Sequence, residues 1–545
     1  MLVGIFTAAL IAFVLGYFLY GKFLANRYEL DNSRATPSHT DYDGVDRVPA
    51  YKAVLLGHHF SSIAGAAPIV GPIIAALAFG WLPVLLWIVL GAIFIGGVID
   101  FSAMVASIRH KACSIAEIGR NYMSPLSYRL LLVFIWFTLV YVLTVFADLT
   151  ATTFVDNGGV ASSSLMFIVF AVLFGLVINK FKVSLVRASV IFIPLVFAAI
   201  WAGQKVPISP DLLAGLITDD PRKNFSIILI VYCFAASTTP VWILLQPRDY
   251  LSSFLLYASI IAGFIGILLG GFAVKYPAFI SWSVPQMGTL FPILFITVAC
   301  GACSGFHSIV ASGTSSKQLN KESDARPVAY GGMLLEGIVA VIALATVVML
   351  SKSDPLTSRP PLQIYGEGIG NFVGLMGIPA RFGESFGLLA LSTFILTTLD
   401  TATRLGRYIF EELFNLKGRC ARYISTFATL VLPTIFVLIT IKDANGNPMP
   451  AWKAIWPVFG ASNQLLAGLV AIVIATWLHK TGRKLGFILL PVFFMNVVTI
   501  WALIVLLREY RFSAVGIIAS VLSLLAALLI CEACRTVSGF VKRSR

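Results

Sequence analysis

Apolar stretches of about 20 residues recur along this chain, and they limit its fold more than any other feature. A helix of that length crosses the hydrocarbon core of a bilayer. Residues 485–507, for example, contain no charged side chain. A buried helix of a soluble protein keeps one polar face, and these stretches are apolar all round. Because backbone groups in lipid must bond within their own segment, we predict an all-α polytopic membrane protein.

Counting the apolar stretches predicts about fifteen transmembrane helices. The expected spans are residues 2–20, 57–80, 82–107, 129–155, 164–180, 187–203, 225–246, 252–275, 289–315, 328–350, 385–404, 422–441, 456–478, 485–507 and 512–534. The basic flank of the first span (Lys22, Arg27) follows that span, which predicts an uncleaved anchor helix and not a signal peptide.

The basic residues are distributed unequally between the two sides of these spans. The 545-residue chain has 39 Lys and Arg against 25 Asp and Glu, a net charge of +14. Most Lys and Arg fall in the loops on the same side as the C-terminal tail, which carries Lys542, Arg543 and Arg545. The positive-inside rule therefore predicts a cytoplasmic C-terminus and an external N-terminus. The charge is explained by orientation in a lipid bilayer, and we expect no nucleic-acid partner.

The seven cysteines predict no disulfide framework, because none lies in an expected outer loop. Cys300 with Cys303, and Cys531 with Cys534, form CxxC pairs inside apolar runs, where they serve either packing or a metal site. The chain contains no HExxH, Walker or GxSxG motif. We therefore expect no enzyme activity, no cofactor and no resident metal, apart from H⁺ or Na⁺ as a coupling ion.

Helix-breaking residues interrupt two of the expected spans. Residues 57–72 read GHHFSSIAGAAPIVGP, and residues 232–249 read YCFAASTTPVWILLQPRD. Such breaks free backbone groups that lipid cannot satisfy, so they should face a cavity or a ligand. They fall in the second and seventh spans, an odd offset that gives them opposite orientations. Two inverted five-helix units, each opening with a broken helix, are typical of secondary transporters with a site at the midplane.

The residues expected to contact substrate lie in and around these two breaks. They are Ser62, Ala64, Gly65, Ala66, Pro68, Ser237, Thr238, Thr239 and Pro240. Gly65 is expected to turn the chain at positive φ, where a Cβ atom would be penalised. The partial positive charge at the start of a half-helix would suit a substrate carboxylate.

A second group of residues is expected to couple transport to an ion. His307 lies in mid-span, where an ionisable side chain is a functional hypothesis by default. Ser304, Ser308 and Ser312 recur at helical spacing and would either supply oxygen ligands to Na⁺ or let helices pack closely. His58 and His59 could shuttle protons or cap a helix. The full set is His58, His59, Ser304, His307, Ser308, Ser312, Thr314 and Ser315.

Charged residues near the ends of spans are candidates for gates. Asp400 and Arg404 are four residues apart on one helical face, which favours an ion pair. Arg248 and Asp249 are expected in an inner loop, either as part of a cytoplasmic gate or in a solvated turn. The gating set is Asp100, Asp400, Arg404, Glu336, Arg248 and Asp249.

Long motifs give the chain a resemblance to a known family. They are GHHFSSIAGAAPIVGP, TPVWILLQPRDYL, FPILFITVACGACSGFHSIVASGTS, ESDARPVAYGGMLLE, LSTFILTTLDTATRLGRYIFEEL and IWPVFGASNQLLAG, and they cover residues from about 50 to 470. They resemble the carbon starvation protein A family of bacterial inner-membrane transporters. That resemblance implies a leucine-transporter-like 5+5 inverted repeat of the amino acid–polyamine–cation superfamily. It also implies uptake of peptides, with pyruvate as a substrate of some members.

The expected organisation has five parts. They are an anchor helix with a cytoplasmic loop (residues 1–56), inverted repeat 1 (57–203), inverted repeat 2 (225–404), additional helices (422–534) and a basic cytoplasmic tail (535–545). We expect a cation-coupled importer of small carboxylate-bearing nutrients, most readily peptides, used under carbon starvation. A pyruvate/proton symporter of the same family, a passive channel and a membrane-embedded metal enzyme using His58, His59 and His307 remain alternatives. The oligomeric state is left open.

Overall fold

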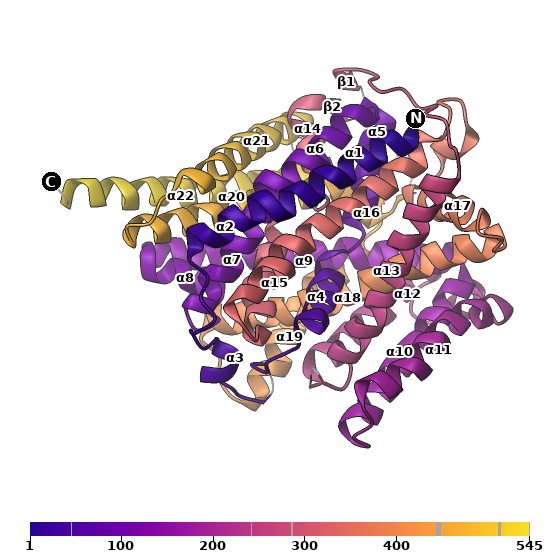
Figure 1. The fold of residues 1–545 in the computed structure, drawn as a ribbon, viewed down its shortest axis with the longest axis horizontal. Helices are drawn as coiled ribbons and strands as arrows, with labels where there is room; N and C mark the ends of the chain where they lie inside the picture. The colour runs from indigo at the N-terminus through magenta and orange to yellow at the C-terminus, as the bar shows by residue number, and fades with distance from the viewer. Residues whose placement is uncertain (45, 241, 285–286, 443–447, 511–513, 544–545) are drawn as a thin grey trace.

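The computed structural model describes residues 1–44, 46–240, 242–284, 287–442, 448–510 and 514–543. That part of the chain is mostly helical (Figure 1). Its only strands form two short antiparallel hairpins: β1 (Ser283–Val284) with β2 (Gly288–Thr289), and β3 (Ile441–Lys442) with β4 (Pro448–Met449). The prediction of a mostly helical, multi-span membrane protein is confirmed.

Within the described residues, eleven helices are long and apolar enough to cross a membrane. A twelfth span is counted if α4 (Lys52–Ile63) and α5 (Ala67–Phe79), which are bent by 45° at a short break, cross as one. The expected count of about fifteen is therefore not confirmed. Two expected spans lack a long apolar helix because α12 (Pro221–Thr238) has polar ends and the run at 289–315 is split. In α22 (Ala514–Arg543), the described residues include the shorter apolar segment Ala519–Leu529.

The other helices follow in chain order. The long ones are α1 (Leu2–Leu15) continuing through η1 (Gly16–Tyr20) into α2 (Gly21–Tyr28), α6 (Trp81–Gly91) continuing through η2 (Ala92–Gly96) into α7 (Gly97–Arg109), α9 (Pro125–Asp156), α10 (Gly158–Asn179), α11 (Leu185–Lys205), α13 (Leu245–Leu269), η6 (Arg326–Tyr330) with α16 (Gly331–Val348), α18 (Ala380–Phe414), α19 (Arg419–Leu438), α20 (Ala451–Lys480) and α21 (Gly486–Tyr510). The short ones are α3 (Pro37–Thr40), α8 (Ile115–Tyr122), α14 (Leu290–Thr297), α15 (Gly305–Gly313), α17 (Pro361–Gly374), η3 (Pro210–Leu213), η4 (Ser315–Gln318), η5 (Glu322–Asp324) and η7 (Pro355–Ser358).

Polar residues between the spans begin several of these helices. The side chains of Ser114, Ser124, Asn157 and Asp220 accept hydrogen bonds from the first free N–H groups of α8, α9, α10 and α12. These N–H groups have no partner inside the helix, so the caps stabilise each start.

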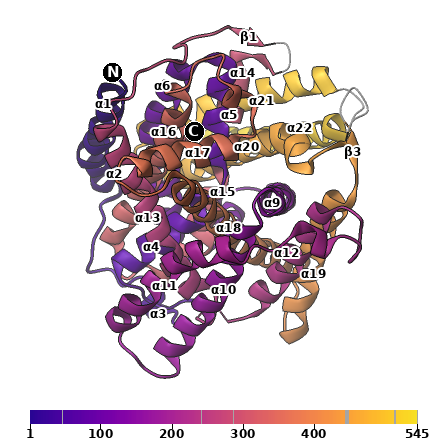
Figure 2. The same ribbon diagram turned by 90° about the vertical axis from the view of Figure 1, so that its right-hand side faces the viewer.

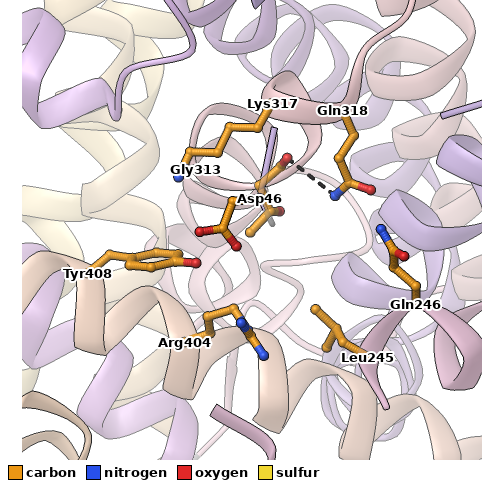
Figure 3. A pocket seen from close by; sticks show the side chains of 9 residues that line it. Asp46, Leu245, Gln246, Gly313, Lys317, Gln318, Arg404 and Tyr408 are labelled. Carbon is orange, nitrogen blue, oxygen red and sulfur yellow. Dashed lines mark hydrogen bonds between the residues drawn. The ribbon is translucent and has the colours of Figure 1, made fainter. Parts of the chain in front are cut away.

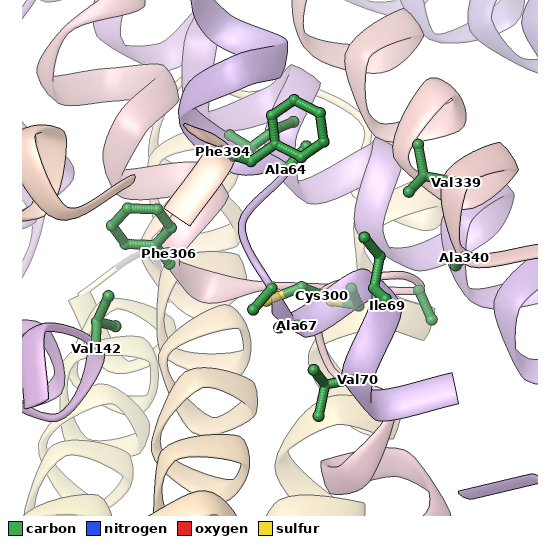
Figure 4. Packing of buried hydrophobic residues seen from close by; sticks show 14 of the residues in the cluster. Ala64, Ala67, Ile69, Val70, Val142, Cys300, Phe306, Val339, Ala340 and Phe394 are labelled. Atoms are coloured by element: carbon green, nitrogen blue, oxygen red, sulfur yellow. The ribbon is translucent and has the colours of Figure 1, made fainter. Parts of the chain in front are cut away.

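The helices pack around two long central ones, α9 and α18, which contact each other extensively. α5 packs against α16, and α15 packs against α7. The α10–α11 hairpin and the C-terminal pair α21–α22 lie at opposite ends of the molecule in both views (Figures 1 and 2). Figure 4 shows apolar side chains, including Ala67, Val70 and Phe306, around Cys300 where the chain leaves helical structure.

The two interruptions do not both fall where the sequence predicts them. The first is confirmed, since α4 ends at Ile63 and α5 begins at Ala67. At the second predicted break, α12 instead ends at Thr238, because Pro240 cannot continue it, and α13 begins at Leu245 as a separate helix. A second interruption lies in residues 298–304, VACGACS, between α14 and α15. Uniform hydropathy hides it, and its signal is the run of small residues around Gly301.

Candidate ion and substrate site at the helix interruptions

The two interrupted segments lie side by side. Gly301 is so close to the start of α5 that an added Cβ would be 3.6 Å from the Cα of Pro68. An added Cβ on Gly71 of α5 would lie 2.4 Å from the carbonyl oxygen of Thr297, the last residue of α14. Small residues therefore bring backbone against backbone at this crossing. Of the expected substrate residues, Ser62, Ala64, Gly65, Ala66 and Pro68 all lie here and are buried.

The other expected substrate residues lie at the end of α12, where side chains of α18 contact them. Thr398 donates to the carbonyl oxygen of Ser62 at 3.2 Å. Arg404, two turns further along α18, donates at 2.9 Å to the carbonyl oxygens of Ala236 and Thr239. Ser237, Thr238, Thr239 and Pro240 are thus near the first interruption but outside the crossing of α5 and α14.

Arginine side chains donate hydrogen bonds to the backbone carbonyls that the sequence assigns to a ligand. Besides Arg404, Arg407 donates to the carbonyl oxygen of Ser237 at 2.8 Å, and Arg422 donates to that of Thr238 at 3.4 Å. Cations at the end of a helix satisfy its last carbonyls and favour its dipole. The expectation that these carbonyls face a ligand or a cavity is therefore corrected, because arginine already fills the role.

Gly65 is required by close packing and not by positive φ. The backbone of Gly65 does not have a positive φ. An added Cβ would lie 2.7 Å from Cε2 of Phe146 and 3.0 Å from Oγ1 of Thr398. The expected turn at positive φ is therefore wrong, and the physical reason for glycine is the approach of α9 and α18.

Gly65→Ala is expected to destabilise the protein by about 1–3 kcal/mol, because overpacking a closed core forces neighbours apart. It should also slow transport, since the added methyl group displaces Phe146 and Thr398. The measurement is thermal unfolding of the purified protein together with its uptake rate. Gly4→Ala is the matched control, because a Cβ added there meets nothing within 4 Å. Equal stability of the two variants would contradict the packing role.

Three fully buried ionisable residues meet beside the second interruption. His307 of α15 lies between Asp100 of α7 and Glu336 of α16. Its Nδ1 is 3.2 Å from Oδ2 of Asp100, and its Nε2 is 3.1 Å from Oε2 of Glu336. The sequence assigns Asp100 and Glu336 to gates, whereas the structure places them on either side of the expected coupling histidine.

Polar neighbours hold this cluster in place. Ser308 donates to Oδ1 of Asp100 at 3.2 Å. Asn463 of α20 accepts from the backbone N–H of Phe306 at 2.9 Å and from Ser304 at 3.1 Å, and its amide donates to Sγ of Cys300 at 3.3 Å. Sequence reasoning missed Asn463 as a site residue, although it is one of three adjacent polar residues in the otherwise apolar motif IWPVFGASNQLLAG.

The expected hydroxyl stripe is only partly directed toward the cluster. Ser312 and Thr314 donate to carbonyl oxygens of their own helix, at 2.8 Å and 3.0 Å. Ser315 is hydrogen-bonded to Nδ1 of His59 at 2.8 Å. Ser304 and Ser308 are therefore the members of the stripe that face the cluster.

A second buried network joins four helices. Arg248 contacts Asp400 of α18 and Tyr232 of α12, and its Nη2 is 3.6 Å from Oδ1 of Asp249. His58 of α4 is 2.7 Å from Oδ2 of Asp249. The placement of Arg248 and Asp249 in an inner loop is wrong, because both lie in the first turns of α13 and are fully buried.

The expected pairing of Asp400 with Arg404 also needs correction. Asp400 is paired with Arg248 and accepts from Tyr232 at 2.9 Å, while Arg404 binds the end of α12. The α12 carbonyls lie within reach of a long side chain, and Arg248 is the nearer cation to Asp400. Contacts with neighbouring helices therefore replace the ion pair that the i, i+4 spacing on α18 predicts.

An open pocket with an empty volume of about 340 Å³ lies where α13 begins and α15 ends (Figure 3). It is lined by Asp46, Leu245, Gln246, Gly313, Thr314, Lys317, Gln318, Arg404 and Tyr408. Asp46 comes from the loop before α4, and that loop is fastened nearby because Ala50 N–H donates to the carbonyl oxygen of Gln318 at 2.9 Å. One carboxylate and two cations thus face the pocket.

These features define a multi-span membrane protein with a helix crossing of small residues and a buried acid–histidine–acid cluster. The chain belongs to the carbon starvation protein CstA family, whose model matches residues 1–368 and 356–502. The resemblance drawn from the motifs is therefore confirmed.

Individual relatives are also similar over most of the chain. The peptide transporter CstA of Helicobacter pylori (strain J99) is 32% identical over 90% of this chain and 79% of the relative. The pyruvate/proton symporter BtsT of Escherichia coli (strain K12) is 29% identical over 92% of this chain and 81% of the relative. A structure of MhsT with L-phenylalanine aligns with a TM-score of 0.47 and 13% identity, covering 89% of this chain and 99% of that one. The named relatives are transporters, which agrees with the expectation that the chain is not an enzyme.

Proposed function

We propose that the protein is a cation-coupled secondary active transporter that imports small carboxylate-bearing nutrients across the bacterial inner membrane during carbon starvation. The observation that carries this proposal is the crossing of two interrupted helices beside the buried Asp100–His307–Glu336 cluster. Interrupted helices at a crossing are the usual place for substrate and coupling ions in secondary transporters.

The packing of the helices supports an inverted repeat with revised boundaries. In this proposal the first unit is α4–α5, α6–α7, α9, α12 and α13, and the second is α14–α15, η6–α16, α18, α19 and α20. The α10–α11 hairpin is an insertion in the first unit. The opening segments occupy the second and ninth expected spans, an odd offset that gives opposite orientations. The units thus cover residues 52–269 and 290–480 in place of 57–203 and 225–404.

Contacts in one unit have counterparts in the other. α5 packs on α16 as α15 packs on α7. α4 packs on α13 as α14 packs on α20, and α9 packs on α12 as α18 packs on α19. Even the short helices correspond, since α8 contacts α9 and α20 as α17 contacts α18 and α13. This pattern is expected of a pseudo-two-fold axis through the contact between α9 and α18.

We infer that the coupling ion is a proton carried by His307 together with its two carboxylates. A histidine with a carboxylate near each ring nitrogen has a proton acceptor on both sides, so a proton can pass among the three groups. Buried carboxylates are costly when no positive charge balances them. We therefore expect the cluster to gain or lose a proton when the protein opens to either side. Na⁺ held by Ser304, Ser308 and Asp100 is the alternative, which the same assays distinguish.

The network of Arg248, Asp249, Asp400 and His58 fits a gate. It ties α4 to α13 and α18 at the end of the first interrupted helix. Movement of α4 would have to separate His58 from Asp249, which are 2.7 Å apart. In the proposed mechanism this contact closes the path to the pocket that Asp46 and Arg404 line.

Peptides are the first candidate substrate, because the relatives named as peptide transporters support that class. Pyruvate is the second, supported by the relative named as a pyruvate/proton symporter. Counterflow in proteoliposomes tests both: vesicles loaded with unlabelled substrate should accumulate the same labelled substrate. Competition by dipeptides, tripeptides and pyruvate would identify the class. Uptake that does not saturate would favour a channel and contradict the proposal.

The orientation is a separate prediction. With the C-terminus in the cytoplasm, a reporter fused at the end of the chain should be active on the cytoplasmic side. A reporter inserted at residue 215, in the loop before α12, should be active on the outer side. Alkaline phosphatase fusions are active on the outer side and fluorescent-protein fusions on the cytoplasmic side, so each is a control for the other. A cytoplasmic residue 215 or an external C-terminus would reverse the proposed direction of the gate.

A further inference from the structure

We propose that Cys300, His307 and Glu336 form a binding site for a divalent transition-metal ion, with Zn²⁺ as the best-matched ion. One ligand atom from each of the three residues can be chosen so that all lie within 4.8 Å of one another. Sulfur, imidazole nitrogen and carboxylate oxygen together are a donor set that Zn²⁺ accepts in tetrahedral sites with an open fourth position.

Unsatisfied atoms at the site support an ion. Among the described residues, Oε1 of Glu336 is buried without a hydrogen-bond partner, and Nε2 of His307 and Oε2 of Glu336 have only each other. Nε2 of His307 and Oε2 of Glu336 are only 3.1 Å apart. That distance is compatible with two ligands of one metal, since atoms at about 2.0–2.1 Å from a tetrahedral ion are roughly 3.3 Å apart. Buried polar atoms without partners call for an explanation.

The charge of the cluster also favours a divalent cation. Asp100 and Glu336 bring two carboxylates into a fully buried place, and His307 is the only ionisable group between them. Without an ion, a single imidazolium charge cannot balance both carboxylates. Zn²⁺ would balance its own two anionic ligands, the Glu336 carboxylate and the Cys300 thiolate, while Asp100 keeps Nδ1 of His307 and the Ser308 hydroxyl as partners. On binding, a Zn–S bond replaces the S–H bond of Cys300, and the thiol proton leaves to solvent.

The surrounding residues are arranged as supports for metal ligands. Asp100 lies 3.2 Å from Nδ1 of His307, the arrangement in which a carboxylate orients a metal-binding imidazole. Asn463 donates to Sγ of Cys300 at 3.3 Å and fixes the position of the sulfur. The ligands come from the second interruption, α15 and α16, so a bound ion would hold these segments together. We therefore expect Zn²⁺ to stop the transport cycle, and that consequence rests on the proposed function.

The test uses the full chain purified in detergent, with Zn²⁺ alone and Co²⁺ alone as probes. We expect one Zn²⁺ per chain in competition with a chromophoric chelator. Co²⁺ should give a near-ultraviolet sulfur-to-metal charge-transfer band. Cys300→Ser should remove the band and weaken Zn²⁺ binding at least about tenfold, as losses at metal sites do. Glu336→Gln should weaken binding to a similar extent.

Cys303→Ser is the matched control, because Cys303 is a buried cysteine of the same interruption and is not one of the three ligands. It should keep both the band and the Zn²⁺ affinity. Zn²⁺ should inhibit counterflow by the unchanged protein and by Cys303→Ser, and much less by Cys300→Ser. No saturable binding, or equal effects of the two cysteine variants, would overturn the site. Binding without any transport would instead contradict the proposed function alone.

Discussion

Arg248→Ala should lower the free energy of unfolding by about 3–5 kcal/mol, the largest effect on stability expected from a single residue here. Arg248 is fully buried and is the cation that contacts Asp400, Asp249 and Tyr232. Its removal leaves Asp400 without its ion-pair partner and leaves Asp249 with His58 alone. The effect should appear as a large drop in the midpoint of thermal unfolding in detergent and as a poor yield of monodisperse protein.

Two further variants make this expectation specific. Arg34→Ala breaks an ion pair with Glu322 in which Arg34 is about half exposed, so it should cost about 0–1 kcal/mol. Adding Asp400→Asn to Arg248→Ala should restore part of the lost stability, because it removes one of the unbalanced charges. Equal midpoints for Arg248→Ala and Arg34→Ala would show that the buried network does not hold the helices together.

His307→Ala should reduce uptake driven by a pH gradient to the level of protein-free liposomes while leaving counterflow largely intact. The physical reason is that counterflow needs only the substrate-bound half of the cycle, whereas accumulation needs the ion to be released on the inner side. Glu336→Gln keeps the shape of its side chain but removes its charge, and should act in the same direction. Both rates are measured with the same labelled substrate in the same vesicle preparation.

His479→Ala is the control for this experiment, since His479 is exposed at the end of α20. It should retain uptake driven by the gradient. If His307→Ala retains that uptake as well, His307 is a packing residue. If Ser308→Ala raises the Na⁺ concentration for half-maximal uptake while His307→Ala has no effect, the coupling ion is Na⁺.

The sequence predicted the helices well because hydropathy reports burial in lipid directly. The first interruption could be read from Pro68, Gly65 and the polar residues before them. The second could not, because 298–304 contains no proline and is as apolar as the helices on either side. Its non-helical path depends on contacts such as Gly301 against Pro68 and Asn463 against Phe306, which come from distant parts of the chain.

The candidate site shows the same division. His307 could be singled out by its type and its place in mid-span. The positions of Asp100 and Glu336 on either side of His307 could not be predicted, since these residues are 207 and 29 positions away in the sequence. Spacing along α18 pairs Asp400 with Arg404, whereas Arg248, from another helix, is its partner. Spacing along one helix identifies possible partners, and packing between helices selects among them.

Accumulation of labelled substrate by proteoliposomes, with and without an imposed inward proton gradient, tests the central claim most directly. The account predicts saturable accumulation above the external concentration that collapses when a protonophore removes the gradient. Simple equilibration, at a rate that is proportional to concentration and unaffected by the protonophore or by a Na⁺ gradient, would contradict it.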